Sequence, residues 1–261
     1  MIEISHIDKR YDTVEALKDV SISVPKGELF GLIGPDGAGK TTLFRSLGTL
    51  LLPDSGTMTF DGHDVVKDYP YVLQHVGYMP GTFSLYQDLS VRENLDFFAS
   101  VFQTTVEENY ELIKDIYVML EPFAKRRAGA LSGGMKQKLA LCCALIHKPL
   151  VLVLDEPTTG VDAVSRREFW AMLRKLKDDG ITILVSTAYM DEAALCDRIA
   201  LIHNGVVLRT GTPQEITQGF DKPLYAASGG DPYTLMHLLR ELPEVERVHP
   251  FGDALHITAK A

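Results

Sequence analysis

A glycine-rich segment that ends in a lysine and two threonines carries the strongest chemical signal in the sequence. It comprises Gly34, Pro35, Asp36, Gly37, Ala38, Gly39, Lys40, Thr41 and Thr42, and it fits the pattern G-x-x-x-x-G-K-[ST]. The glycines let successive backbone N–H groups point toward phosphate oxygens, and a following helix adds the positive end of its dipole. Lys40 would reach the outer phosphates, and the Thr41 hydroxyl would ligate Mg²⁺. The segment predicts a nucleotide phosphate site; the competing interpretation is a glycine-rich turn that binds nothing.

Two adjacent carboxylates, Asp155 and Glu156, follow the apolar residues 151–154. Ligands of open α/β sheets bind at the carboxyl ends of the strands, so we expect these side chains in the same site. Asp155 would hold Mg²⁺ through water, and Glu156 would polarise the attacking water. An ordinary Asp-Glu turn after a core strand is the competing interpretation.

A second pair of glycines follows a serine at the start of an expected helix. The segment comprises Leu131, Ser132, Gly133, Gly134, Met135, Lys136 and Gln137. Free N–H groups at such a helix start can hold an anion. One domain seldom needs two anion sites for one nucleotide, unless the second serves a nucleotide that another subunit binds. The alternative is a helix cap that happens to contain glycine.

Alternating strands and helices are needed to position these segments. The apolar runs at 28–33, 150–154 and 181–185 are typical of buried parallel strands. Helical spacing of apolar residues follows the phosphate loop and recurs within 90–127, 131–146, 166–177 and 191–196. Residues 3–7 and 20–24 alternate as half-buried antiparallel strands do, and Ser90 precedes Glu93 at capping-box spacing. The pattern predicts a mostly parallel sheet with helices on both faces.

Composition excludes several classes of function. The net charge of −9 provides no basic field for nucleic acid. The three cysteines have no C-x-x-C spacing, which favours reduced, buried thiols in the cytosol over disulfides or zinc. The eight histidines are scattered, so a metal site built from protein ligands alone is not expected. No apolar run is long enough to span a bilayer.

Taken together, the motifs resemble the nucleotide-binding domain of an ATP-binding-cassette (ABC) protein over residues 1 to about 215. Residues 34–42 are similar to the Walker A loop, residues 131–137 to the LSGGQ-type signature, and residues 151–156 to the Walker B strand with its catalytic glutamate. The D-loop of the family is matched by Gly160, Val161 and Asp162. Tyr11 falls where the family has an aromatic that stacks on adenine, and a surface tyrosine without that role is the alternative.

The resemblance implies a P-loop NTPase fold of class α/β. Its parts would be a mostly parallel sheet with flanking helices, an antiparallel β subdomain, and an α-helical signature subdomain at about residues 90–147. Residues 1–219 would form the ATPase domain. Residues 220–261 read strand, helix, strand, strand and resemble the small βαββ appendage of such cassettes.

The resemblance also implies ligands and partners. ATP and Mg²⁺ would bind between the phosphate loop of one cassette and the signature of a second, which explains the two anion sites. Pro35-Asp36, residues 83–86 and residues 165–170 resemble bacterial drug-exporter ATPase subunits of the ABC-2 type, some of which fuse two cassettes in one chain. Integral membrane permease subunits would contact residues 83–91, and the protein would lie peripherally on the cytoplasmic face of the membrane. The apolar residues of that segment line a partner groove or belong to the core; they are Phe83, Leu85, Tyr86 and Leu89.

Two positions depart from the family pattern. The family has a glutamine after the strand at 76–79, where this chain has Gly81, and a histidine after the strand at 181–187, where this chain has Ala188. Gln87 lies six residues beyond the first position and is not expected to replace the missing glutamine. Each lost group costs about 10²–10³ in rate. We therefore expect this site to bind ATP but to hydrolyse it slowly, while the signature completes the competent site of a partner cassette.

Two other function classes compete with an exporter ATPase. One is a soluble cassette that acts on ribosomes or DNA or as a switch, which the acidic charge and the lack of a basic extension disfavour. The other is a module that binds nucleotide without turnover. The transported substrate is not readable from this chain, because specificity lies in the membrane domains of such transporters.

Overall fold

The computed structural model describes residues 1–219 and 222–260, and their contacts divide into two units, Met1–Pro213 and Gln214–Ala261. Each unit has an apolar core of its own. The domain boundary predicted between residues 219 and 220 falls at residues 220–221, which lie outside the described residues.

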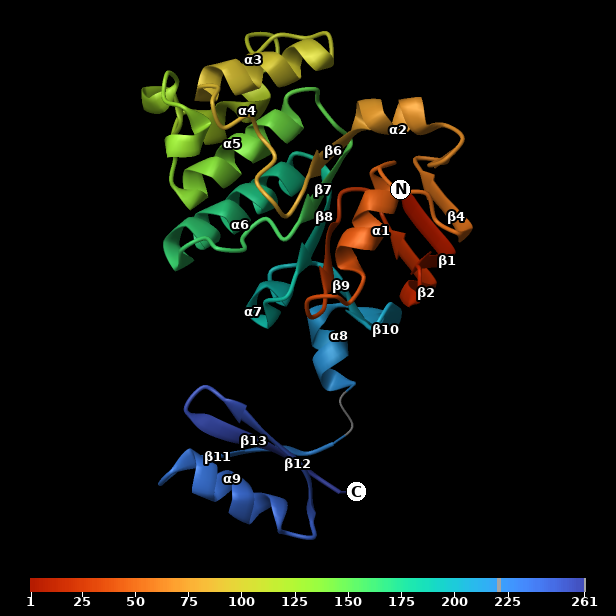
Figure 1. The fold of residues 1–261 in the computed structure, drawn as a ribbon, viewed down its shortest axis with the longest axis vertical. Helices are drawn as coiled ribbons and strands as arrows, with labels where there is room; N and C mark the ends of the chain where they lie inside the picture. Colours follow the sequence, from red (N-terminus) through yellow and green to blue (C-terminus); the bar gives the residue numbers. More distant parts are fainter. Residues whose placement is uncertain (220–221, 261) are drawn as a thin grey trace. The chain divides into compact units, whose positions relative to one another are not determined.

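A six-stranded, mostly parallel sheet forms the centre of the first unit (Figure 1). Its strands, in spatial order, are β10 (Val206–Gly211), β9 (Arg198–His203), β3 (Leu29–Ile33), β8 (Thr182–Thr187), β7 (Val151–Asp155) and β6 (Val76–Met79). Only the β9–β10 pairing is antiparallel among the described strands of this sheet. Every residue of β3, β7 and β8 is buried, which explains the apolar runs at 29–33, 151–154 and 183–185.

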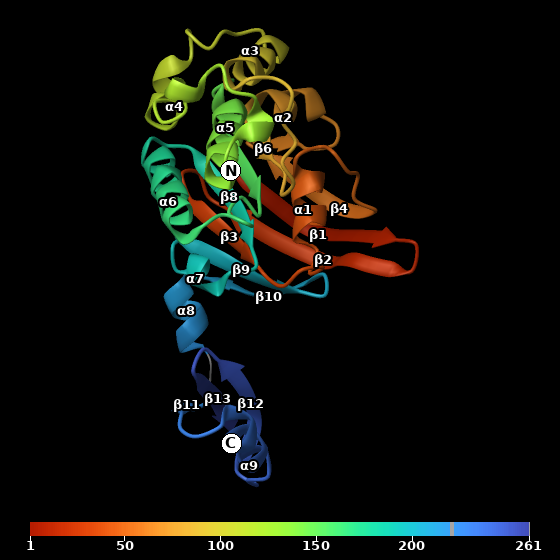
Figure 2. The same cartoon turned by 60° about the vertical axis from the view of Figure 1, so that its left-hand side comes forward.

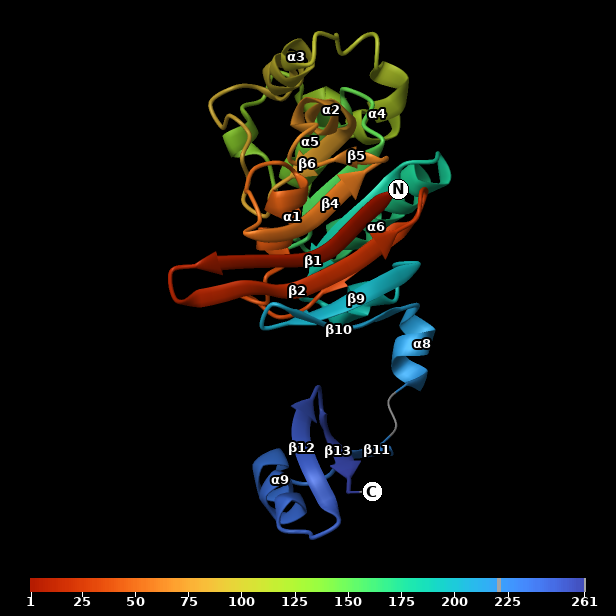
Figure 3. The ribbon, with the colours of Figure 1, turned by 90° about the vertical axis from the view of Figure 1, so that its right-hand side faces the viewer.

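A second, antiparallel sheet has the order β2-β1-β4-β5 (Figure 3). Its strands are β1 (Ile2–Tyr11), β2 (Val14–Val24), β4 (Ser55–Phe60) and β5 (His63–Asp64). β1 and β2 are longer than the predicted strands at 3–7 and 20–24. Register shifts interrupt their pairing after Ile4 and after Ile7, so the strict alternation that reveals a strand in sequence is lost there.

The two faces of the central sheet are covered differently (Figure 2). Helices α6 (Ala163–Asp178) and α7 (Met190–Ala193) pack against one face. On the other face, α1 (Lys40–Leu47) lies between the two sheets, and its Leu43, Phe44 and Leu47 join the shared core. Helices therefore lie on both faces of the central sheet, as predicted, and the antiparallel sheet packs on the far side of α1. The helix predicted at 191–196 is shorter, since the chain turns after Ala193 to enter β9.

Helices α3 (Val91–Val101), α4 (Tyr110–Tyr117) and α5 (Gly133–Leu145) gather at one end of the first unit (Figure 1). Two short 3₁₀ turns, Glu121–Phe123 and Ala128–Ala130, connect α4 to α5. The sequence did not predict α2 (Tyr69–His75), because its seven residues include a proline in the first turn and are too few to show periodicity.

The second unit contains β11 (Leu224–Ala227), α9 (Pro232–Arg240), β12 (Val245–Phe251) and β13 (Ala254–Ala259), preceded by α8 (Pro213–Gln218). The strands form an antiparallel sheet of order β11-β13-β12. Val248, Leu255 and Ile257 are its buried core, against which α9 packs Leu235 and Leu239. This is the βαββ pattern expected from the sequence.

The predicted capping box at the start of α3 is confirmed. The Ser90 Oγ accepts a hydrogen bond from the Glu93 N–H at 3.2 Å, and Glu93 Oε2 accepts one from the Ser90 N–H at 2.8 Å. The Glu93 carboxylate also accepts from the Ser90 hydroxyl, and these bonds lower the pKa of Glu93. Two free N–H groups at the helix start are thereby satisfied.

Ser90→Ala should lower the free energy of unfolding by about 1 kcal/mol, because the helix loses its cap. Urea unfolding followed by circular dichroism measures this change. Ser100→Ala in the same helix is the matched control, since the Ser100 hydroxyl bonds only to the Phe97 carbonyl within the helix. Equal losses in the two variants would contradict the assigned role of the cap.

Candidate functional site

A cleft of about 890 Å³ brings together residues from five separate parts of the first unit. Its lining includes Tyr11 from the end of β1, the phosphate loop, Pro80 to Thr82 after β6, and the two carboxylates after β7. The predicted site residues in this lining are Tyr11, Asp36, Gly37, Gly39, Lys40, Thr41, Thr42, Gly81, Asp155 and Glu156. The cleft lies at the carboxyl ends of β3, β6 and β7, where open α/β sheets bind ligands.

The backbone of the phosphate loop is arranged to receive an anion. Gly39 has a φ of 106°, and a Cβ there would lie 2.4 Å from the Ala16 carbonyl oxygen, so only glycine fits. Among the described residues, the N–H groups of Asp36, Gly37 and Gly39 have no hydrogen-bond acceptor. The first N–H groups of α1 also lack acceptors within the helix, as they do at the start of any α-helix. These donors fit the oxygens of a nucleotide's phosphates.

Lys40 is the charged centre of the loop. Its side chain is 3% exposed, and its ammonium donates to the carbonyl oxygens of Gly34 at 2.7 Å and Pro35 at 2.9 Å. The same Nζ lies 3.1 Å from Oε1 of Glu156. A buried ammonium with a carboxylate partner is stable only while that pairing or an equivalent one persists. Phosphate oxygens are such an equivalent, so a nucleotide would compete with Glu156 for the Lys40 charge.

Asp155 and Glu156 are held in place by Ser186, which the sequence did not indicate. The Ser186 hydroxyl donates to Asp155 Oδ1 at 2.6 Å and accepts from the Glu156 N–H at 2.9 Å. Asp155 is 2% exposed, whereas the Glu156 carboxylate is partly exposed in the cleft. Glu156 has a φ of 48°, which is uncommon for a residue other than glycine and turns its side chain toward Lys40.

The donor set fits Mg²⁺ as well as phosphate. Asp155 and Thr41 offer a carboxylate and a hydroxyl oxygen in the same cleft, and oxygen is the ligand atom that Mg²⁺ prefers. Asp155 Oδ2 is not engaged by Ser186, which leaves it available to a metal or its waters. Within the described residues, no group of three or more histidine, cysteine or acidic side chains could hold a metal alone.

The two positions that depart from the family pattern lie differently. Gly81 lines the cleft, and a Cβ at this position would lie 3.1 Å from the Asp155 carbonyl oxygen and 3.8 Å from its Oδ2. Ala188 is exposed immediately after β8 and is not among the described residues that line the cleft. Gln87 is also absent from that lining; its carbonyl accepts a hydrogen bond from Gly129.

The signature and the D-loop meet at a second place. Ser132 caps α5, and its Oγ accepts from the Met135 N–H. A Cβ on Gly134 would lie 2.6 Å from the Ser165 hydroxyl, so the missing side chain lets α5 approach the start of α6. A Cβ on Gly133 would lie 3.5 Å from the carbonyl oxygen of Gly160. The N–H groups at the start of α5 thus lie beside Gly160, Val161 and Asp162, and no signature residue is found in the described lining of the cleft.

A buried carboxylate links the ends of β7 and β8. Glu192 is 2% exposed, and it accepts hydrogen bonds from Thr158 at 2.7 Å and Thr187 at 2.6 Å. Arg166 lies 4.0 Å from the same carboxylate and places its guanidinium over the Tyr189 ring. The network fixes the backbone just before Ala188. Sequence analysis missed it because a glutamate in a short helix reads as a surface residue.

The comparisons with known proteins agree with this geometry. Residues 17–159 match the family described as ABC transporter. The chain is 44% identical over 222 residues to the probable multidrug ABC transporter ATP-binding protein YbhF of Escherichia coli strain K12, covering 84% of this chain and 38% of that protein. It is 37% identical over 258 residues to the Nod factor export ATP-binding protein I of Rhizobium sp. strain N33, covering 97% and 84% of the two chains.

Solved structures match the same region. The ATP-binding subunit of an ABC transporter superposes with a TM-score of 0.76 at 28% identity, over 84% of this chain and 93% of the other. The dimeric structure of MJ0796, a bacterial ABC transporter cassette, superposes with a TM-score of 0.74 at 27% identity, over 81% and 98%.

Ser186→Ala should lower the free energy of unfolding by about 1–3 kcal/mol, because a buried carboxylate oxygen loses its donor. Denaturant unfolding measures the change. Asp155→Ala and the double variant complete the cycle, since removal of both partners should cost less than the sum of the single changes. Strict additivity of the two changes would show that the bond between Ser186 and Asp155 carries no energy.

Proposed function

The chain belongs to the ABC transporter family, and we propose that it is the ATP-binding subunit or domain of an exporter whose own ATP site turns over slowly. The observation that carries this proposal is the cleft that places Lys40, Thr41, Asp155 and Glu156 around one space. The names of the relatives, a multidrug transporter component and Nod factor export proteins, favour export. The chain spans 38% of the YbhF protein, so the activity of a longer assembly belongs to the proposal.

Each residue of the cleft has a defined part in this proposal. The free N–H groups of the loop and the Lys40 ammonium would bind the phosphates of ATP, and Tyr11 would stack on the adenine. Lys40 would leave Glu156 on binding the phosphates, which frees that carboxylate to accept a proton from the attacking water. Mg²⁺, held by Thr41 and by Asp155 through water, would neutralise charge on the outer phosphates.

The signature would serve a second cassette rather than this cleft. The N–H groups at the start of α5 lie beside the D-loop and apart from the phosphate loop, as expected if they complete a site on a partner. Gly81 and Ala188 supply neither a donor nor a charge where the family has two polar side chains. We infer an asymmetric pair, in which this domain holds ATP and its signature completes the faster site. A partner cassette could be a separate subunit or be fused in the same polypeptide.

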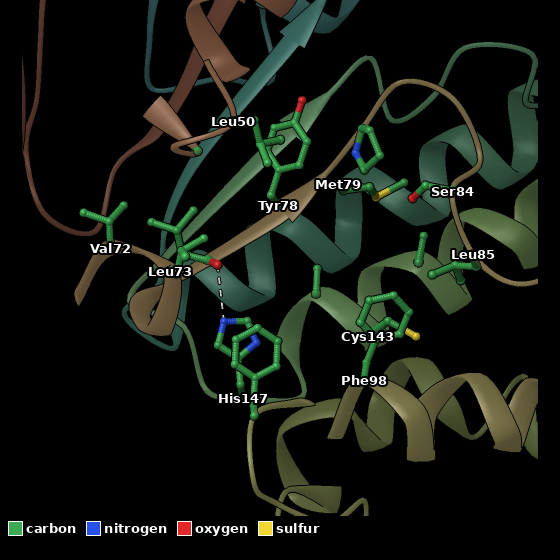
Figure 4. A pocket seen from close by; sticks show the side chains of 16 residues that line it. Leu50, Val72, Leu73, Tyr78, Met79, Ser84, Leu85, Phe98, Cys143 and His147 are labelled. Carbon is green, nitrogen blue, oxygen red and sulfur yellow. Dashed lines mark hydrogen bonds between the residues drawn. The ribbon is translucent and has the colours of Figure 1, made fainter. Parts of the chain in front are cut away.

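A groove on the first unit is suited to a membrane partner (Figure 4). It has a volume of about 180 Å³ and lies between β6, α3 and α5. Leu50 and Leu73 rise partly exposed at its rim, and Leu85 and Phe98 lie deeper. Burial lowers the pKa of His147 to about 4, so this imidazole is neutral at physiological pH and the groove carries no charge from it. Pro80 lines both this groove and the nucleotide cleft.

The segment predicted to contact the permease is held by a buried asparagine. Asn94 on α3 accepts a hydrogen bond from the Tyr86 N–H and donates to the carbonyl oxygens of Tyr86, Leu89 and Ser90. This anchoring directs Leu85 into the groove, while Tyr86 stays half exposed against Phe97. Of the four apolar residues proposed for the groove, Leu85 is the one that lines it, among the described residues.

An apolar groove next to the nucleotide cleft supports a peripheral position on the cytoplasmic face of the membrane, held there by permease subunits. Within residues 1–219 and 222–260, the structure has no helix that combines the length and the apolar character needed to cross a bilayer.

Restoring the two missing groups should raise ATP turnover. The double variant Gly81→Gln, Ala188→His should increase the steady-state rate of the purified protein by at least about 100-fold, because each group stabilises charge in the transition state. A phosphate-release assay at saturating Mg-ATP measures the rate, and binding of ATP should change little.

Gly81→Ala controls for steric effects, since it adds a Cβ next to the Asp155 carbonyl without an amide. Ordinary cassette turnover by the unchanged protein would refute the slow-site proposal. Failure of the unchanged protein to bind ATP would refute the function itself.

Leu73→Asp should abolish capture of the protein by its permease subunits, because a carboxylate in the groove cannot be desolvated by an apolar partner. Leu208→Asp is the matched control, as Leu208 is also exposed but lies on β10 outside the groove. Co-purification from detergent-solubilised membranes measures the effect, with ATP binding as a check on folding. Undiminished capture of the Leu73 variant would refute this docking surface.

A further inference from the structure

An arginine of the cleft has no role in the function proposed so far. Arg45 lies on α1, four residues after Thr41 and therefore on the same side of the helix. Helical side chains point back toward the N-terminus, so the Arg45 side chain extends toward the phosphate loop. It lines the cleft together with Gly81, Asp155 and Glu156.

The guanidinium of Arg45 is exposed, and it forms no ion pair within the described part of the chain. The neighbouring cation, Lys40, differs in that it is buried and paired with Glu156. An unpaired guanidinium offers five N–H donors in a planar fork that matches phosphate oxygens. The cleft therefore contains a second cation with N–H donors that can bind an anionic ligand.

Tyr78 marks the position of the Arg45 side chain. Its hydroxyl is buried with the Arg45 guanidinium as a near neighbour, and Figure 4 shows it on the far side of the ring from His147. Burial and the Asp155 charge raise the pKa of Tyr78 to about 12, while the nearby Arg45 acts in the opposite direction. Arg45 therefore lies near Tyr78 on β6, the strand that leads to Gly81.

Gly81 leaves space at this point of the cleft wall. A Cβ at position 81 would lie 3.1 Å from the Asp155 carbonyl oxygen and 3.8 Å from its Oδ2, and Gly81 and Arg45 line the same cleft. A guanidinium donates hydrogen bonds but cannot ligate a metal, so Arg45 cannot take over the contact of a glutamine with Mg²⁺. It can contact phosphate oxygens, which bear the charge that distinguishes ATP from ADP.

We propose that Arg45 binds the terminal phosphate of ATP from the side of the cleft that Gly81 leaves open, and so makes this site selective for ATP over ADP. The proposal rests on the function proposed above. It assigns Arg45 a contact with the nucleotide, whereas a cation in the last turn of α1 could also act only on the helix dipole.

The test compares the dissociation constants of a non-hydrolysable ATP analogue and of ADP, both with Mg²⁺, by isothermal titration calorimetry. Arg45→Ala should weaken the analogue about tenfold and ADP less than twofold, because only ATP carries the contacted phosphate. Arg45→Lys should show an intermediate loss, since it keeps the charge without the fork. Arg174→Ala, an exposed arginine on α6, is the matched control and should change neither constant.

Equal weakening of both nucleotides, or no weakening of either, would overturn the proposal. A role in the helix dipole alone would lower the unfolding temperature and leave the ratio of the two constants unchanged. The Gly81→Gln background locates the contact, because the new amide should reduce the effect of Arg45→Ala to less than threefold. The same tenfold effect in that background would refute the placement beside Gly81. If the unchanged protein binds neither nucleotide, the proposed function fails instead.

Discussion

The hydrogen bond between Ser186 and Asp155 is the contact on which the site and the sheet both depend. β7 is buried along its whole length between β6 and β8, yet its last residue is Asp155, and Glu156 follows directly. A carboxylate at such a position is tolerated only when a donor satisfies it. β8 supplies that donor in Ser186, which also accepts from the Glu156 N–H. The register of two neighbouring strands thus sets where Glu156 emerges, and Lys40 completes the arrangement from the adjacent loop.

Buried polar side chains that are satisfied by distant partners are the part of the site that the sequence does not predict. The apolar runs of β3, β7 and β8 and the glycine-rich loop were predictable, because burial and phosphate binding each impose a local pattern. Ser186 and Glu192 were not, since a serine in an apolar strand and a glutamate in a short helix acquire meaning only through partners far along the chain. The antiparallel sheet beside α1 was predicted as two short strands, because bulges in β1 break the alternation that defines its length.

The three motifs that the sequence predicts to bind nucleotide do not all lie at the same place in the structure. The phosphate loop and the two carboxylates share one cleft, whereas the signature lies with the D-loop against the start of α6. One domain therefore presents backbone N–H donors at two separate places, the phosphate loop and the start of α5. Of the two positions that depart from the family pattern, Gly81 opens the wall of the cleft and Ala188 lies outside its described lining. Both positions lack the polar side chain of the family, but only Gly81 is among the described residues that line the cleft.

Pro80 lines the nucleotide cleft on one side and the apolar groove on the other. When two ligands contact the same residue, the binding of one can change the binding free energy of the other. Such a coupling free energy is reciprocal by thermodynamic necessity. If a bound nucleotide changes the affinity of the groove for its partner by some factor, the partner changes the affinity of the cleft for nucleotide by the same factor. Coupling through Pro80 would thereby link occupancy of either site to occupancy of the other.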